Sequence, residues 1–341
     1  MRQFLSPFFR IPAQRKKACT ILSLFLFTVL ISFGSFDEPS GEAGETEASI
    51  FRIGIQTWFS SGAGEWQIEG YSSDDLSFLS RLDWNDLDSN LLVLKADYQL
   101  KPGIRLSGSY GTGDIENGRN TDSDWYLGPE FDSGAFKFSE SISETDGQTV
   151  LFDINIIIDW FPENRRDTER LYFGAIIGYQ IYEDELIDRD GIQTVVDEVP
   201  VYEPFEEGQN ATYSFKWQAY RAGVRGRCDL TRATTISMDA ALLIGVTYRG
   251  EGFWNLRTDM RPEPPNLINE ADSGWGGDFT LWLSQMLTRN LSVEIGWKSL
   301  YLMSESGIHT SFLADGSIGQ TTLSDVKSSR NGYFAGITCH F

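Results

Sequence analysis

A two-residue alternation of apolar and polar side chains constrains this chain more than any other feature. In TVLFDINIIIDWF, residues 149–161, alternate positions from Val150 to Trp160 are all apolar, while the positions between them include Asp153, Asn155 and Asp159. Successive side chains of a β-strand point to opposite faces, so the pattern predicts strands with one apolar face. It recurs at 51–56, 92–99, 236–247 and 291–301, which predicts an all-β fold.

The connections between these runs alternate in length. Tight links at 101–103, 162–167, 229–233 and 288–290 alternate with long polar ones at about 60–75, 114–147, 184–209, 250–272 and 307–329. A soluble sandwich alternates too, but short turns at one end and long loops at the other are typical of an outer-membrane barrel. The four short and five long links predict about ten transmembrane antiparallel strands. The aromatic last residue, Phe341, fits assembly into an outer membrane.

Aromatic residues near the strand ends are expected to form the two girdles that flank a lipid-facing band. These residues are Tyr98, Tyr110, Trp160, Tyr179, Trp217, Tyr248 and Trp297.

The N-terminal segment predicts export. Residues 1–36 hold five bases and no acid, and the bases precede the apolar run from Ala18 to Phe36, as in a secretory signal, although the run approaches the length of a membrane anchor. The predicted organisation is a signal peptide at 1–36, an acidic spacer at 37–49 and a barrel at 50–341. Removing the signal leaves Cys228 and Cys339, which are expected to be free thiols.

The charge of the chain limits its partners. Its 49 acids against 28 bases give a net charge of −21, which repels phosphate backbones and attracts cationic peptides and metal ions. Nucleic acid is therefore excluded as an expected partner. The acidic run IYEDELIDRD, Ile181–Asp190, has no regular calcium-ligand spacing and is interpreted as solvated loop charge.

One block of sequence adds a family resemblance. The segment SRLDW…KADYQLKPGIRLSGSYG…TDSDW, Ser80–Trp125, with GYQ at Gly178–Gln180, resembles the omptin family of Gram-negative outer-membrane proteases. The resemblance implies an omptin-like barrel in the outer membrane with an extracellular cleft. It also implies an aspartate pair on the second long loop, Asp122 and Asp124, facing an Asp-His pair on the fourth.

The fourth loop departs from that pattern. Asp259 stands at the aspartate position, but Arg261 stands where the histidine is expected, and Arg257 falls where omptins hold a basic substrate side chain with an acid. Arginine stays protonated and cannot act as the base that activates a water. The chain has two histidines, His340 near the periplasmic end and His309 in the fifth long loop, which is interpreted as an ordinary loop residue.

These observations predict an integral outer-membrane barrel that is a surface binding or adhesin-type protein lacking the omptin Asp-His dyad. Its expected partners are outer-membrane lipid and an extracellular peptide or protein, and no cofactor or metal site is predicted. The alternatives are an aspartic endopeptidase that uses Asp122, Asp124 and Asp259, and a narrow small-solute channel. The aspartates could also coordinate a divalent ion without a histidine.

Overall fold

The computed structural model describes residues 51–71, 77–128, 131, 134–160, 170–205 and 208–341. The predicted signal peptide at 1–36 and the spacer at 37–49 lie outside these residues. Most of the described chain is antiparallel β-strand, which confirms the all-β prediction. None of its helices is long and apolar enough to cross a membrane.

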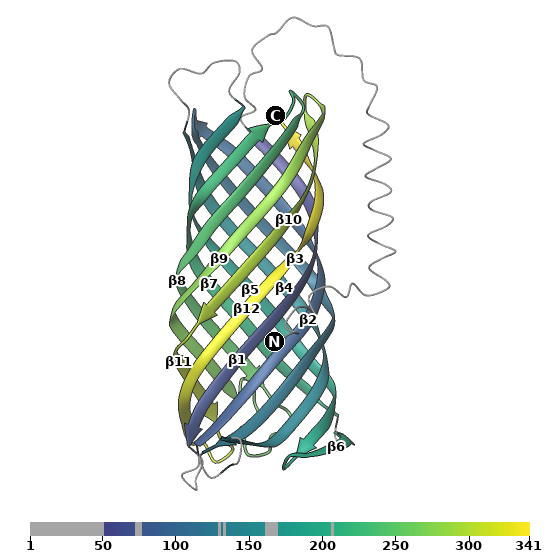
Figure 1. Cartoon of the computed structure of the whole chain (residues 1–341), viewed down its shortest axis with the longest axis vertical. Coiled ribbons are helices and arrows are strands. Elements are labelled where there is room, and N and C mark those ends of the chain that lie inside the picture. The colour runs from purple at the N-terminus through teal and green to yellow at the C-terminus, as the bar shows by residue number, and fades with distance from the viewer. Residues whose placement is uncertain (1–50, 72–76, 129–130, 132–133, 161–169, 206–207) are drawn as a thin grey trace, which may run out of the picture. The chain divides into compact units, whose positions relative to one another are not determined.

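Ten long strands close into a barrel (Figure 1). They are β1 (Phe51–Tyr71), β2 (Ser77–Lys101), β3 (Ile104–Leu127), β4 (Ala135–Trp160), β5 (Leu171–Val196), β7 (Asn210–Asp229), β8 (Thr234–Phe253), β9 (Leu267–Thr288), β10 (Leu291–Ser304) and β12 (Ile318–His340). Each pairs with the next, and β1 pairs with β12. Two short strands are added to this ring. β6 (Val199–Pro204) pairs with β5, and β11 (Gly307–Phe312) lies between β9 and β12.

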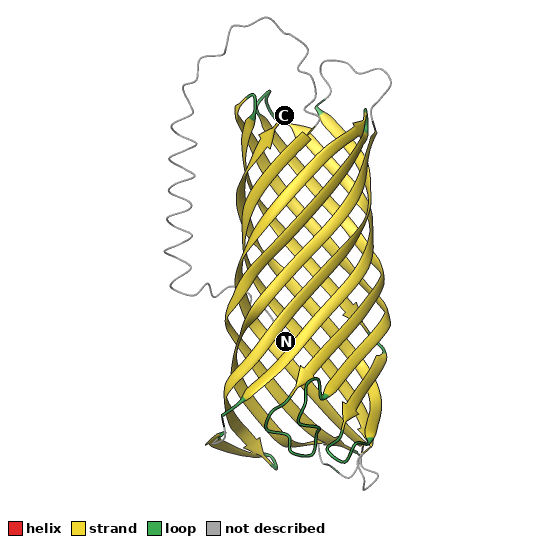
Figure 2. Ribbon diagram, turned by 180° about the vertical axis from the view of Figure 1, so that it is seen from behind, coloured by secondary structure: helices red, strands yellow, loops and turns green. Residues whose placement is uncertain are grey.

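The two ends of the barrel differ, as the connection lengths predict. Figure 2 shows the longer loops gathered at the end away from the C-terminus. At the other end β2 turns into β3 within Lys101–Ile104, where Gly103 takes a φ of 79° that an L side chain rarely adopts. The backbone NH of Phe341 donates to the carbonyl of Phe51 at 2.9 Å beside these turns. The predicted turn at 162–167 lies outside the described residues.

Four of the five long polar segments are mainly strand, so that part of the prediction is wrong for them, whereas the fourth, 250–272, is a loop over residues 254–266. Most of 114–147, for example, continues as β3 and β4, and most of 184–209 belongs to β5 and β6. Polar composition misleads here because a strand that extends above the bilayer meets water on its outer face. Sheet pairing still satisfies its backbone hydrogen bonds, so the strands continue.

The predicted apolar face points out of the barrel. On β4, Ile154, Ile156 and Trp160 are 43%, 45% and 60% exposed, while Asp153 and Asn155 at alternate positions are buried. Tyr98 and Tyr110 also face outward, as the girdle prediction requires. Trp217 and Tyr248 do not. Both are buried in the barrel core, because their registers place them on the inner face of β7 and β8.

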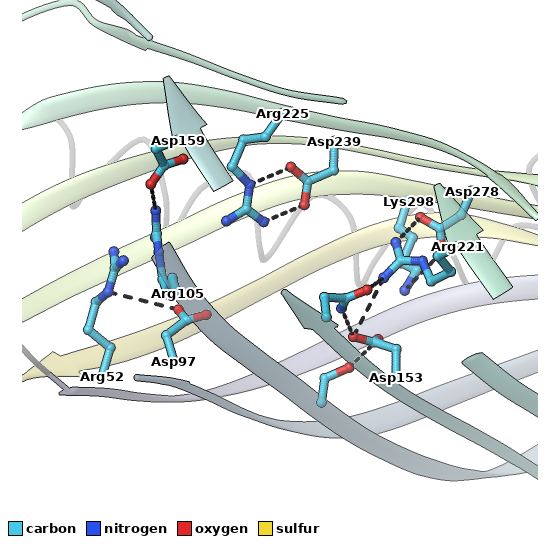
Figure 3. A network of polar contacts seen from close by, with 12 residues as sticks. Arg52, Asp97, Arg105, Asp153, Asp159, Arg221, Arg225, Asp239, Asp278 and Lys298 are labelled. Atoms are coloured by element: carbon cyan, nitrogen blue, oxygen red, sulfur yellow. Dashed lines mark hydrogen bonds and ion pairs between the residues drawn. The ribbon is translucent and has the colours of Figure 1, made fainter. Parts of the chain in front are cut away.

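Ion pairs fill the interior of the barrel toward its turn end (Figure 3). They are Arg52–Asp97, Arg105–Asp159, Arg225–Asp239, Arg221–Asp153, Arg221–Asp278 and Lys298–Asp278. Exposure falls from 27% and 26% for the Arg52 and Asp97 side chains to 6% and 0% for those of Arg221 and Asp278. The polar inner positions of the strands are thus paired with one another.

Aromatic side chains fill the interior toward the loop end. Trp84 stacks on Tyr213 with ring centroids 5.0 Å apart and meets the ring of Phe215 edge-on at 5.2 Å. Trp66, fully buried, stacks on Tyr213 and on Trp254 of the fourth loop. This core holds the extended strands together above the membrane. In the wall, the two cysteines of the described chain, Cys228 and Cys339, are free thiols, as predicted.

Candidate functional site

The candidate site lies on the inner wall of β2, β3 and β4 at the loop end. Directly opposed residues of paired strands share one face of a sheet. Asp124 is opposed by Ser80 and Ser139, and Asp122 by Leu82 and Ser141. Asn120 follows on the same face, opposed by Trp84 and Ser143. The predicted pair therefore stands on β3 rather than on a loop, and rigid sheet pairing fixes its position.

Burial and mutual repulsion disfavour the charged forms of this pair. The pKa of Asp122 lies well above its ordinary value because the carboxyl is desolvated and the charge of Asp124 is close. Desolvation also raises the pKa of Asp124, while a hydrogen bond with Ser80 opposes the rise. Oδ1 of Asp122 is buried and has no hydrogen-bond partner in the described structure. The pair is therefore poised to hold a proton or to attract a cation.

The cation that the pair faces is Arg257 of the fourth loop. Its charge lowers the pKa of both Asp122 and Asp124, and their charges raise the pKa of Arg257 in turn. Asp259 holds this guanidinium through two hydrogen bonds, from Nε at 2.8 Å and from Nη2 at 2.7 Å. The hydrogen bonds with Arg257 lower the pKa of Asp259, whose side chain is 58% exposed. Asp259 is thus the partner of Arg257.

Arg261 is engaged elsewhere. Its Nε donates to the carbonyl of Pro265 at 2.6 Å, and its guanidinium lies 4.0 Å from the ring centroid of Phe312. Its backbone NH donates to the carbonyl of Phe312 at 2.9 Å. The residue at the expected histidine position therefore fastens the fourth loop to the β11 hairpin.

Neither histidine is placed as a base for the aspartate pair. His309 is not the ordinary loop residue expected. It is buried in β11, where its Nδ1 lies 2.6 Å from Oδ1 of Asn269, its Nε2 lies 2.8 Å from Oγ of Ser311, and its ring stacks on Trp66. Desolvation lowers its pKa to about 4. His340 contacts Ser292 at the opposite end of the barrel, since it pairs with Arg52 near the start of β1.

Asp188 is a buried acid that the sequence interpretation missed. It is 2% exposed on β5 and accepts hydrogen bonds from Trp84 at 3.1 Å, Asn120 at 2.8 Å and Thr145 at 2.5 Å. Desolvation raises its pKa to about 6 despite these three donors. Asp184 on the same strand is also buried, so the acidic run 181–190 is not simply solvated loop charge. The sequence signal for this burial was alternation, because every second residue of the run, Tyr182, Asp184, Leu186 and Asp188, lies on one face of the strand.

Within the described part of the chain, no group of three or more His, Cys, Asp or Glu side chains is arranged to hold a metal ion. An aspartate pair with raised pKa values, next to an arginine fixed by a third aspartate, can bind a charged group or share a proton. Aspartate-only activation of a water would require one of the pair to stay ionised.

A family model described as Protochlamydia outer membrane protein (Pom) matches residues 61–339. Among solved structures, the outer membrane protease OmpT from Escherichia coli is similar with a TM-score of 0.71 and 13% sequence identity, covering 89% of this chain and all of that one. This similarity confirms the omptin-like fold and, at that identity, shows the fold alone. No curated protein matches the chain.

Other outer-membrane barrels are more distant. The translocator domain of the autotransporter NalP from Neisseria meningitidis matches with a TM-score of 0.30 and 11% identity, covering 96% of this chain and 98% of that one. A FadL homologue from Pseudomonas aeruginosa matches with a TM-score of 0.28 and 7% identity, covering 85% and 90%. Family and fold agree on an integral outer-membrane location.

Proposed function

The chain belongs to the family of Protochlamydia outer membrane proteins, and from that premise we propose that it is a surface binding protein of the adhesin type, which captures extracellular peptides or proteins at the loop end of its barrel. The observation that carries this proposal is the pairing of Arg257 with Asp259 opposite Asp122 and Asp124. The charged group of the fourth loop that faces the acid pair is a fixed arginine, which cannot act as a catalytic base. The acids are thereby available for electrostatic recognition.

The ligand class follows from charge. Asp122, Asp124 and Asp259 outnumber Arg257 at this site, and the whole chain is strongly acidic. Opposite charge accelerates encounter and discriminates between partners. We therefore expect cationic segments of extracellular proteins to bind more tightly than acidic ones.

A second candidate is an aspartic endopeptidase that uses Asp122, Asp124 and Asp259. The raised pKa values of the pair favour it, because two nearby carboxyls that share a proton can act as acid and base together. Such an enzyme would cleave best at acid pH. OmpT, the structural neighbour, is a protease, but at 13% identity that name does not extend to this chain.

A small-solute channel is disfavoured by the packed interior. Arg330 on β12 reaches Tyr182 and Asp184 on β5, and Trp217 on β7 donates to Ser328 on β12 at 2.9 Å. These contacts cross the barrel, and barrels of about this strand number are filled by side chains. We expect the folded protein to show no ion conductance in planar lipid bilayers.

The test combines binding and cleavage on one preparation. The refolded, lipid-embedded barrel is mixed with fluorescent cationic and acidic peptide libraries, and both anisotropy and cleavage are recorded between about pH 4 and 8. Selective binding of cationic peptides without cleavage, weakened by Asp122→Asn and Asp124→Asn, supports capture. Cleavage that each of the two substitutions abolishes would overturn capture and support the endopeptidase instead. Equal binding of both libraries would refute the electrostatic recognition.

A further inference from the structure

A row of directly opposed residues crosses the sheet at the loop end, from the aspartate pair to the β5–β6 hairpin. Asp124 on β3 opposes Ser139 on β4. Ser139 in turn opposes Val196 on β5, and Val196 opposes Val199 on β6. Directly opposed residues point to the same side of a sheet. Both valines therefore lie on the face that carries Asp124.

The far end of this row is apolar and open. Val196 and Val199 are 40% and 58% exposed. Phe138 lies beside the hairpin turn, where its carbonyl accepts a hydrogen bond from the NH of Asp197 at 3.0 Å. Its ring stacks on that of Tyr126, two residues beyond Asp124 on β3, with centroids 4.4 Å apart. The two valines and the two aromatic rings form a surface that we call the apolar rim.

The hairpin offers a face rather than an edge to a partner. Among the described residues β6 pairs with β5 alone, at the loop end of the barrel (Figure 1). Pro200 and Pro204 of β6 have no backbone NH, and proline on an edge strand hinders pairing with another chain. Contact with side chains on the apolar rim is therefore favoured over addition of a strand to β6.

The length of the row sets the spacing that a ligand needs. Neighbouring strands lie about 4.8 Å apart, so Val199, three strands from Asp124, is about 14 Å away across the sheet. An extended peptide advances about 3.3 Å per residue and turns every second side chain to the same face. A side chain four residues from a base therefore reaches about 13 Å along that face, close to Val199, whereas one two residues away stops at about 7 Å.

We propose that the apolar rim holds a Leu- or Phe-like side chain of an extended peptide whose Lys or Arg is bound by Asp122 and Asp124, with these two peptide residues four positions apart. This inference rests on the proposed capture of cationic peptides and adds a second determinant of its specificity. Charge attracts every cationic segment to the loop end, and burial of apolar surface then discriminates among them.

The test measures Kd by fluorescence anisotropy on the lipid-embedded barrel. The peptides are Gly-Ser chains with an Arg-Arg pair and one Leu placed two, four or six residues from the nearer Arg, on either side. Leu at four residues should bind about five- to tenfold more tightly than Ser at that position, and Leu at two or six less than about twofold. Each ratio compares two peptides on one preparation, so partial loss of folded protein cancels.

Substitutions on the two faces of the hairpin separate the rim from the fold. Val196→Ser and Val199→Ser should each lower the Leu-to-Ser ratio to about twofold and leave the Kd of the Ser peptide unchanged. Val199→Leu should preserve or raise the ratio. Tyr202→Ser is the matched control, because Tyr202 is 74% exposed on the same strand but alternates with Glu203, which opposes Gln193 on the face of the aspartate pair. Its ratio should not change.

The outcomes distinguish this inference from the capture on which it rests. Equal Kd values with Leu and with Ser, or equal losses in Val199→Ser and Tyr202→Ser, would overturn the apolar rim and leave capture of cationic peptides standing. Arg-Arg peptides that bind no more tightly than Glu-Glu peptides would overturn both. N-methylation of the peptide backbone between Arg and Leu should preserve the Leu preference, and its loss would assign the peptide to the edge of β6 instead.

Discussion

Arg330 on β12 and Asp184 on β5 form an ion pair across the barrel, with Nη2 and Oδ1 3.2 Å apart and side chains 0% and 1% exposed. The two strands are five places apart in the ring of ten, so the pair joins opposite walls. Arg330 also donates to Ser60, Ser89 and the carbonyl of Leu87. One side chain thus connects β12, β1, β2 and β5.

Replacing Arg330 with methionine should destabilise the barrel by about 3–5 kcal/mol, because Asp184 is left buried without its counter-charge. Urea unfolding in lipid vesicles, followed by tryptophan fluorescence, measures the loss. The double variant Arg330→Met/Asp184→Leu should recover a large part of it, since no unpaired charge remains. Arg249→Met, which breaks an exposed pair with Glu251, should cost about 0–1 kcal/mol. Equal losses for Arg330→Met and Arg249→Met would contradict this account.

The ring itself was predictable from the sequence because a period of two is a local signal. Alternation at 149–161 identified β4 and correctly separated its lipid-facing isoleucines from the inward Asp153 and Asn155. Short turns such as Lys101–Gly103 indicated which strands follow one another as hairpins. Neither signal needs knowledge of a distant residue.

The half of the barrel nearer the loop end was not predictable in the same way. Its outward faces are polar, so composition indicated loops, although Trp66 and Trp84 on the inward faces belong to the core. The arginine that faces the aspartate pair is brought there by parts of the chain that are distant in sequence. Arg257 reaches Asp122 and Asp124 only after β8 and the fourth loop are placed opposite β3, and no local pattern encodes that approach.

Protonation of Asp188 should stabilise the folded barrel as the pH falls from about 6 to about 4. Its folded pKa of about 6 exceeds its ordinary value of 3.8, so the folded state binds this proton more tightly than the unfolded chain. The contribution is most favourable below about pH 4 and is lost as the pH rises to about 6. In Asp188→Asn the loss of stability between these pH values should shrink by up to about 3 kcal/mol. Identical pH slopes in urea unfolding of the two proteins would exclude this role.

Burial of His309 should have the opposite effect, because it makes the folded barrel less stable as the pH falls. Its folded pKa of about 4 lies below its ordinary value of 6.5, so burial favours the neutral ring. Its contribution to stability is complete above about pH 6.5 and is lost as the pH falls to about 4. His309→Gln should reduce that acid-induced loss by up to about 3 kcal/mol, measured by the same unfolding titration. Peptide binding at pH 7 should not change, and a large loss of binding would show that His309 belongs to the ligand site.

Arg257→Gln should strengthen the binding of cationic peptides. The guanidinium faces Asp122 and Asp124 and competes electrostatically with a cationic ligand, so its removal should favour that ligand by about 1 kcal/mol, or about fivefold in Kd. Anisotropy titrations at low and high salt measure the gain, which should shrink as salt screens it. Arg249→Gln is the matched control, because its exposed guanidinium pairs with Glu251 on another part of the loop end. Weaker binding by Arg257→Gln would mean that the arginine contacts the ligand directly, as an anion-binding group.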